Sequence, residues 1–219
     1  MAKKKNTAIE GLLWLLMLAP GLYLLSIWQS LPAEIATHFD INGNPNAWSD
    51  KTTVPYLILG MNVGVYILLK IIPKIDPKKN LDFVSHYQKI RVIMQVFIAT
   101  LSIALLLGAQ DPSINAANLI SFPLILLVVL LGNYFQSIKA NYFIGIRTPW
   151  TLESENVWKK THRLGGKIWF FGGLLMLLLL FVLPSSISIK LIVAFMLLST
   201  IFLFIYSYVL FKKEKNNKV

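Results

Sequence analysis

The stretch RTPWTLESENVWKKTHRLGG, from Arg147 to Gly166, concentrates the side chains of this chain that could do chemistry. Glu155, Trp158 and His162 are spaced by three and four residues, so they would share one face of a helix. A single histidine without a placed nucleophile defines no reaction, and the chain has no HExxH, GxSxG or phosphate-loop pattern. We therefore expect this segment to bind a partner, and the protein not to be an enzyme.

The same stretch carries signals for the start of a helix. Thr148, ahead of Pro149, or Thr151 can cap a helix, and Glu155 would lie in a first turn, where the helix dipole favours carboxylates. Basic residues follow, and Gly165-Gly166 would let the chain approach its neighbours closely or bend. The pattern predicts a short amphipathic helix at this place.

A second polar segment, LPAEIATHFDINGNPNAWSDK, spans residues 31–51 and is rich in turn formers that predict a bend. Asp40, Asn42 and Asn44 could be the first oxygen ligands of a calcium loop of the EF-hand type. The glycine comes too early for such a loop, however, and a lysine stands where a bidentate glutamate is required. His38 has no neighbouring metal ligand, so neither a metal nor a cofactor is predicted.

Long apolar runs flank both polar segments. Apolar residues make up 56% of the 219 residues and charged residues only 14%, which is unlike soluble proteins. About twenty residues of helix cross the core of a bilayer. Six runs approach that length: 9–28, 54–72, 92–109, 119–138, 168–183 and 191–210. The sequence predicts an all-α polytopic membrane protein with six transmembrane helices, forming one integral membrane domain over residues 1–219.

The basic residues are distributed unevenly between the connecting segments. If the N-terminus is inside, only Lys51 and Lys190 of the 21 lysines and arginines fall outside, as expected because basic residues are held in the cytoplasm during insertion. We therefore expect both termini inside, an extracytoplasmic loop over residues 31–53 and a cytosolic loop over residues 139–167. The net charge of +11 then reflects topology and attraction to anionic lipid, and implies no direct nucleic-acid partner.

Few polar side chains interrupt the apolar runs. Charged residues near them, such as Glu10 and Arg91, are placed at the predicted helix ends, whereas ion-coupled transporters usually keep charges within the membrane. The uncharged polar residues inside the runs are expected to form hydrogen bonds between helices. They are Asn62, Gln95, Asn133 and Gln136.

The two polar segments together resemble the SdpI family of bacterial membrane proteins, which act in toxin immunity and signal transduction. The outer LPAEIATHFDINGNPNAW is similar to a family segment of the form LPxxIxxHxxxxGxxNxW. The inner NYFIGIRTPWTLESENVWKKTHRLGG is similar to the family signature NxxxGIRTPWTLxSxxVWxxTHxxGG. The connector PKIDPKKN adds a third match, so the resemblance covers essentially the whole chain, and the inner signature is its most specific part.

The resemblance implies a role at the bacterial cytoplasmic membrane. Family members of the best-known type protect a bacterium against its own secreted peptide toxin, and with toxin present they sequester a cytosolic autorepressor. The resemblance implies a toxin-facing role for Pro32, His38, Asn42, Gly43, Asn46 and Trp48. It implies a cytosolic docking or switch role for Asn141, Gly145, Arg147, Thr148, Pro149, Trp150, Glu155, Trp158, Thr161, His162, Gly165 and Gly166.

Two other interpretations stay open. A small-solute or peptide transporter would use the polar loops as gates, although the lack of charges inside the apolar runs argues against it. A structural protein that interacts with membrane lipids would instead seat an amphipathic inner helix on the membrane surface. In that case Trp150, Trp158 and Trp169 would be its anchors at the interface.

Overall fold

The computed structural model describes residues 2–40, 42, 44–77, 81–111, 114 and 116–217. Gly43, one of the residues predicted to face a toxin, lies outside the described residues. Within them the chain forms seven α-helices, one short 3-10 helix and two strands. In chain order these are α1 (Ala2–Ile27), η1 (Trp28–Ser30), β1 (Glu34–Phe39), β2 (Pro45–Asp50), α2 (Val54–Ile75), α3 (Leu81–Gln110), α4 (Ala116–Phe135), α5 (Pro149–Glu153), α6 (Glu155–Leu179) and α7 (Ser185–Asn216).

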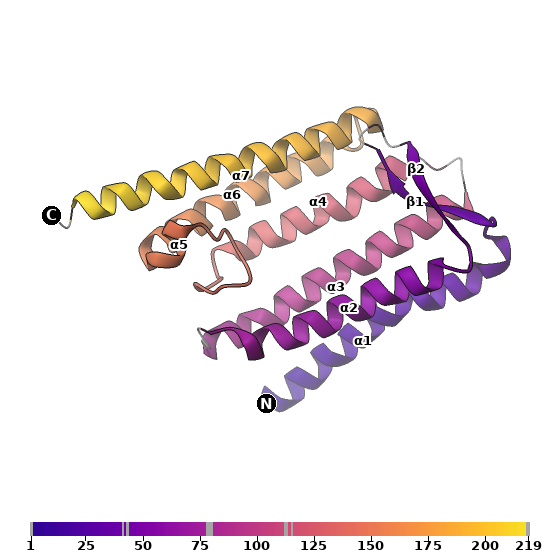
Figure 1. Cartoon of the computed structure of the whole chain (residues 1–219), viewed down its shortest axis with the longest axis horizontal. Helices are drawn as coiled ribbons and strands as arrows, with labels where there is room; N and C mark the ends of the chain where they lie inside the picture. Colours follow the sequence, from indigo (N-terminus) through magenta and orange to yellow (C-terminus); the bar gives the residue numbers. More distant parts are fainter. Residues whose placement is uncertain are drawn as a thin grey trace.

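The long helices lie roughly side by side along the longest axis of the molecule (Figure 1). Helices α1, α2 and α3 pack on one another, α4, α6 and α7 form a second group, and α3 packs on α4 to join the two groups. The hairpin of β1 and β2 lies at one end of this bundle, whereas α5 and both termini lie at the opposite end (Figure 1). The two polar segments singled out in the sequence are therefore at opposite ends.

Four helical segments are long and apolar enough to cross a membrane: Thr7–Ser30, Val54–Ile75, Tyr87–Gln110 and Ile187–Asn216. A shorter apolar helix, Leu119–Phe135, belongs to α4. The predicted fifth run corresponds to the second half of α6, whose first half carries charged residues. The described residues thus contain four candidate spans, fewer than the six segments predicted.

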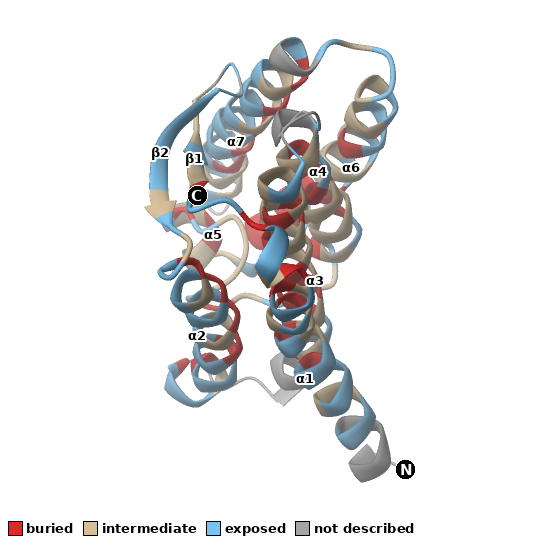
Figure 2. Ribbon diagram, turned by 90° about the vertical axis from the view of Figure 1, so that its right-hand side faces the viewer, coloured by how far each residue is buried: buried red, intermediate tan, exposed pale blue. Residues whose placement is uncertain are grey.

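The outer surface of the bundle is apolar. Buried residues line the inward helix faces, while the outward faces of the same helices are exposed (Figure 2). Large apolar side chains occupy those faces: Leu25 is 72% exposed, Leu178 66% and Leu15 62%. Soluble proteins rarely expose continuous apolar surface of this extent, whereas a lipid environment favours it.

Two features correct the predicted all-α fold. Residues 34–39 and 45–50 form an antiparallel hairpin, because the Asn-rich turn between them brings two extended segments into register. The predicted short amphipathic helix is not separate: α5 has only five residues, and α6 runs without interruption through Gly165-Gly166 to Leu179. Within the predicted 139–167 loop, irregular backbone is therefore limited to residues 139–148 and Ser154, and the irregular segment as a whole begins at residue 136, directly after α4.

The glycines of α6 allow close helix packing and do not bend the chain. A Cβ atom at Gly166 would lie 2.8 Å from the carbonyl oxygen of Gly132 in α4. A Cβ atom at Gly132 would in turn meet the backbone of Trp169 and Phe170. Helices α4 and α6 thus touch backbone to backbone, a contact that small residues permit between helices in membranes.

An ion pair lies inside the first helix group, which corrects the predicted placement of charges at helix ends. Arg91 in α3 donates hydrogen bonds to the carboxylate of Glu10 in α1, and the Arg91 side chain is only 5% exposed. The hydroxyl of Tyr66 in α2 also donates to Glu10, at 3.0 Å. The prediction failed because α3 begins at Leu81, well before the apolar run, and so carries Arg91 into the bundle.

Uncharged polar groups continue along the same helix group. Asn62 donates from Nδ2 to Ser102 Oγ at 2.9 Å, and Gln95 donates from Nε2 to Asn62 Oδ1 at 3.3 Å. The predicted hydrogen bonding between helices is confirmed for these two amides. Asn133 and Gln136 are exposed instead, so the prediction was wrong for them.

Candidate functional site

The turn of the β1–β2 hairpin is organised by one carboxylate. Oδ1 of Asp40 accepts hydrogen bonds from the backbone N–H groups of Asn42 and Asn44, both at 2.8 Å. These bonds, chiefly the one from Asn44, hold the pKa of the Asp40 carboxyl below its ordinary value. The two asparagines therefore contribute backbone groups to the bend, and the toxin-facing role predicted for Asn42 stays a prediction.

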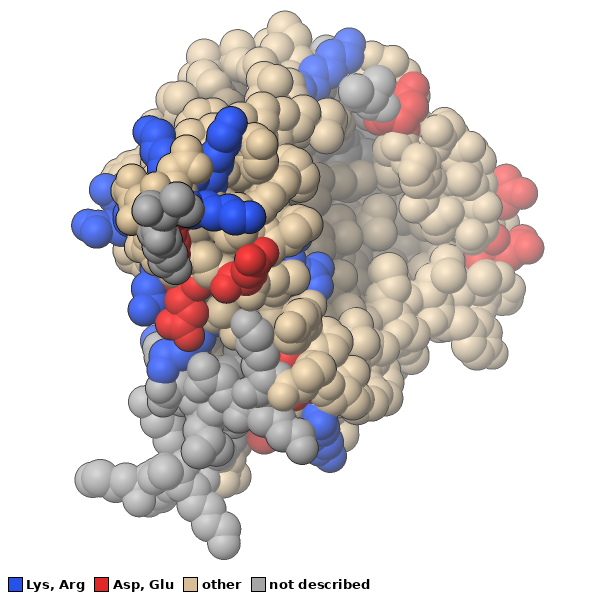
Figure 3. Space-filling model, turned by 60° about the vertical axis from the view of Figure 1, so that its left-hand side comes forward, with Lys and Arg blue, Asp and Glu red and all other residues tan. Residues whose placement is uncertain are grey.

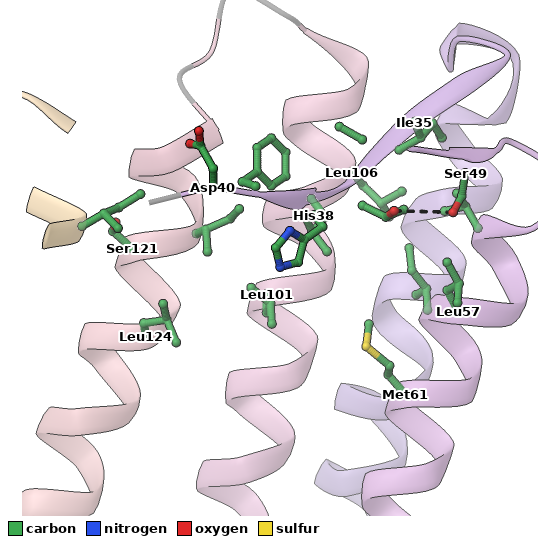
Figure 4. A pocket seen from close by; sticks show the side chains of 18 of the residues that line it. Ile35, His38, Asp40, Ser49, Leu57, Met61, Leu101, Leu106, Ser121 and Leu124 are labelled. Carbon is green, nitrogen blue, oxygen red and sulfur yellow. Dashed lines mark hydrogen bonds between the residues drawn. The ribbon is translucent and has the colours of Figure 1, made fainter. Parts of the chain in front are cut away.

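The hairpin brings His38 and Asn46 together, whereas Pro32 and Trp48 lie apart and exposed. His38 Nδ1 is 2.5 Å from Asn46 Oδ1. The pairing register is irregular on both sides of His38, and such irregularities re-aim side chains. In Figure 4 the imidazole points down between the helices, toward Leu101.

Side-chain contacts hold the hairpin against the end of the helix bundle. Ile35 of β1 is 2% exposed and packs into an apolar cluster with residues of α1, α2 and α3. At the base of the hairpin, Lys51 donates from Nζ to the carbonyl oxygen of Leu31 at 3.0 Å and lies over the ring of Trp28. These contacts tie both strands to the helices, so that β1 holds a defined position over them.

A cavity of about 760 Å³ lies beneath the hairpin (Figure 4). Residues 35–40 of β1 and its turn form its roof, and α2, α3, α4 and α7 line the rest, almost entirely with aliphatic side chains. The few polar side chains in the lining are Thr37, His38, Asp40, Ser49 and Ser121. Sequence reasoning missed this cavity, because its walls come from segments far apart in the chain and no local motif marks them.

At the opposite end, residues 136–148 fold around the side chain of Asn141. Its Oδ1 accepts from the backbone N–H groups of Phe143 and Ile144, both at 2.8 Å, and its Nδ2 donates to the carbonyl oxygens of Lys139 and Ile144. Asn141 is completely buried. It therefore acts as the internal support of this loop and cannot contact a partner directly.

His162 connects the loop to α6. Its Nε2 accepts the backbone N–H of Ile146 at 2.9 Å, so its Nδ1 must carry the proton and donate to the carbonyl oxygen of Trp158, also at 2.9 Å. The Trp158 ring stacks on the imidazole, and its Nε1 donates to Ile138. Gly145 has φ +115° and no room for a Cβ atom beside the imidazole, which explains why glycine is needed there.

Hydroxyl side chains cap the N-terminal ends of α5 and α6, and the same hydroxyls contact α7. Thr148 is the N-cap of α5, its hydroxyl accepts from the backbone N–H of Thr151, and it also pairs with Ser207 of α7 at 3.1 Å. The N-cap of α6 is Ser154, whose hydroxyl donates to Glu214 of α7 at 2.9 Å. The predicted cap at Thr148 is confirmed, but the contacts on α7 had no signal in the local sequence.

Most signature residues are thus parts of a packed structure. Asn141, Thr148, Trp158, Thr161, His162, Gly165 and Gly166 are buried, and Gly145 and Trp150 are partly buried. Trp150 packs against the rings of Phe204 and Tyr208. The exposed signature residues are Arg147, Pro149 and Glu155. Because Trp158 is buried within the bundle, it cannot be the interface anchor that the lipid-interacting alternative requires.

Positive charge gathers around this end of the molecule. Figure 3, which brings forward the end that lies at the left in Figure 1, shows lysine and arginine side chains gathered on this face, with acidic side chains beside them. Exposed basic residues near the signature include Arg147, Lys159, Lys160 and Arg163. Within the described part of the chain, no group of three or more histidine, aspartate or glutamate side chains could hold a metal ion. Glu153 and Glu155 are exposed here too, and Lys159 lies 3.7 Å from Glu155, so basic residues are in excess at this end but do not stand alone.

Burial makes His162 sensitive to acid. Desolvation lowers the pKa of His162 from 6.5 to about 4, so the unfolded chain binds more protons between these pH values. The free energy of unfolding should therefore fall as pH decreases from about 6.5 to 4, by on the order of 3 kcal/mol at full effect. Thermal unfolding of the detergent-solubilised protein from pH 7.5 to 4.5 measures this loss.

The matched variants for this experiment are His162→Gln, which should remove most of the dependence below pH 6.5, and His38→Gln, an exposed position that should keep it. A wild-type unfolding temperature that does not change between pH 7 and 5 would contradict the assignment.

The comparisons with known proteins cover both ends of the bundle. The SdpI/YfhL protein family matches residues 137–207, which contain the whole signature and most of α7. A domain of unknown function, DUF1648, matches residues 15–63, which include the hairpin. The immunity protein SdpI of Bacillus subtilis (strain 168) is 26% identical over 194 residues, 88% of this chain and 90% of that protein. No solved structure matches the chain significantly.

The fold and its apolar surface define a predominantly helical membrane protein, in whose described residues four helices are long and apolar enough to span a bilayer. The matches to residues 137–207 and along nearly the whole chain confirm the resemblance to the SdpI family.

Proposed function

We propose that this chain is an immunity protein of the bacterial cytoplasmic membrane, which protects the cell against a secreted antibacterial peptide. The observation that carries the proposal is the similarity to the immunity protein SdpI. It extends over 88% of the chain and is long enough to include both polar segments. The hairpin end, with its cavity and the facing pair His38 and Asn46, is the proposed toxin-facing surface.

The proposed orientation places the hairpin outside the cell and the termini inside, with six membrane crossings. It is supported by the positions of the basic residues and by the arrangement in Figure 1, where both termini lie at the end opposite the hairpin. α4 and the second half of α6 would be the two crossings that are shortest in apolar length. Close packing of Gly132 against Gly166 would shield them from lipid.

A deletion strain tests the immunity function. Small peptides secreted by the same bacterium are added to wild-type cells, to cells lacking the gene and to complemented cells, and survival is counted. The deletion strain should die at a peptide concentration lower by about tenfold or more, because nothing then protects it from the toxin. Equal sensitivity of all three strains to every peptide fraction would overturn the proposal.

We propose in addition that the exposed cationic face around the signature binds a cytosolic transcriptional repressor. Arg147 is exposed, and its guanidinium donates to the carbonyl oxygen of Tyr142, which holds it in place on the surface of the folded loop. The buried signature residues would position this face without contacting the partner.

Arg147→Ala should reduce recovery of the repressor in a crosslinked pull-down from native membranes by about tenfold, because an arginine at the centre of an interface often dominates its affinity. Membrane insertion should be unchanged, since the side chain is exposed. Lys212→Ala, an exposed basic position in α7, serves as the control. Wild-type recovery with Arg147→Ala at equal expression would count against this docking site.

A further inference from the structure

We propose that the cavity beneath the hairpin receives an apolar segment of a cationic peptide. This inference rests on the proposed immunity function and adds to it the binding site and the chemistry of the ligand. Its volume of about 760 Å³ falls within the range of sites that hold organic ligands. The aliphatic lining from α2, α3, α4 and α7 requires an occupant that is mainly apolar.

The polar groups in the cavity favour a peptide over an acyl chain. Ser121 of α4 is completely buried and lines the cavity, and its hydroxyl has no hydrogen-bond partner. A buried hydroxyl without a partner costs about 1–3 kcal/mol. A peptide segment could satisfy it through a backbone carbonyl or N–H, whereas the hydrocarbon of a lipid could not.

The roof supplies a second polar contact. His38 uses Nδ1 toward Asn46, and its ring is directed between the helices (Figure 4). Its Nε2 can therefore donate to or accept from a ligand backbone, depending on its protonation. His38 of β1 is in the roof of the cavity and Ser121 of α4 is in its wall, so a single extended or helical segment could reach both.

Charge at the hairpin end selects between cationic and anionic occupants. The hairpin carries three acidic residues, Glu34, Asp40 and Asp50. The basic residues at this end are Lys51, whose ammonium is engaged by Leu31 and Trp28, and Lys190 of α7, which is exposed beside the lining residue Ile189. Of the three acidic residues, Asp40 lines the cavity, and their excess over the two lysines favours a cationic peptide and disfavours the phosphate headgroup of an anionic lipid.

Filling the cavity tests the proposal. Leu124 lines the cavity on α4, and Leu127 is a partly buried leucine of the same helix outside the lining. Leu124→Trp should reduce protection in the survival assay by about tenfold or more, whereas Leu127→Trp should protect like the wild type. Unfolding temperatures of both purified variants establish that they are folded to the same extent.

A direct binding measurement separates the inference from the immunity function. The full chain in phosphatidylcholine nanodiscs is titrated with a fluorescent peptide of leucine and lysine, with its leucine and glutamate counterpart, and with a fluorescent fatty acid. The leucine and lysine peptide should bind saturably and lose about tenfold in affinity with Leu124→Trp or Ser121→Val. Empty nanodiscs give the background.

The outcomes distinguish the possibilities. If the wild type protects cells but Leu124→Trp protects equally and leaves peptide binding unchanged, the cavity is not the site and the immunity function stands. If the fatty acid binds saturably and the cationic peptide does not exceed empty nanodiscs, the occupant is lipid and the inference is overturned. If the wild-type protein does not protect cells, the proposed immunity function is wrong. The cavity is then a peptide-binding site only if the cationic peptide binds it saturably in nanodiscs.

Discussion

Glu10→Gln should destabilise the folded protein by about 3 kcal/mol, the lower end of the loss seen when one partner of a buried ion pair is removed. The Arg91 guanidinium would remain at 5% exposure without its counter-charge. The loss is expected at the lower end because Glu10 itself is 33% exposed, so that water can partly compensate. Tyr66 would also lose the carboxylate to which it donates.

A double-mutant cycle makes this prediction specific. The double variant Glu10→Met with Arg91→Met removes both charges and should be less destabilised than the sum of the losses of Glu10→Met and Arg91→Met measured singly, because no buried charge is left unpaired. Unfolding in mixed detergent micelles, followed by circular dichroism, gives the free energies. Additive losses from the two single replacements would show that the two residues do not act as a pair.

The second large effect is expected for Gly132→Leu in α4. Its side chain would be directed against the backbone of Trp169 and Phe170, and helix backbone cannot move aside as a flexible side chain can. Overpacking of this kind costs about 1–3 kcal/mol and sometimes more, and we expect the upper end or failure to fold. The affected contact is the one that joins α4 to α6.

Gly64→Leu provides the matched control, because a Cβ atom at this position of α2 meets nothing within 4 Å. Its unfolding temperature should equal or exceed that of the wild type, since glycine is a poor helix residue. Gly132→Ala tests the same contact with a smaller side chain and should give a smaller loss. Wild-type stability of Gly132→Leu would mean that α4 and α6 are not packed as described.

Much of the helical architecture follows from local sequence. The apolar run predicted from residue 54 corresponds to α2, which begins at Val54 with Pro55 in its first turn, a position where proline costs little. The cap at Thr148 was likewise predictable, because a threonine three residues before another hydroxyl residue satisfies the first free N–H groups. Such signals need only neighbours in the chain.

The predictions failed where distant segments decide the outcome. From the sequence, Gly165 and Gly166 could either bend the chain or let another segment pack closely against it. Only the position of α4 shows that they permit close packing. The Asn-rich bend predicted a turn, but the pairing of two strands around it depends on Ile35 being buried against the helices. The side chains of the signature looked available for binding, yet His162 and Trp158 are used to hold residues 136–148 against α6.

The sequence by itself determined the apolar helices, the two polar segments and the uneven distribution of positive charge, because hydropathy, capping and charge are local properties of the chain. Tertiary structure alone decided the pairing of Glu10 with Arg91 and of Thr148 with Ser207, as well as the cavity under the hairpin. These features join groups that are far apart in the chain, and their contacts exist only after the helices have packed.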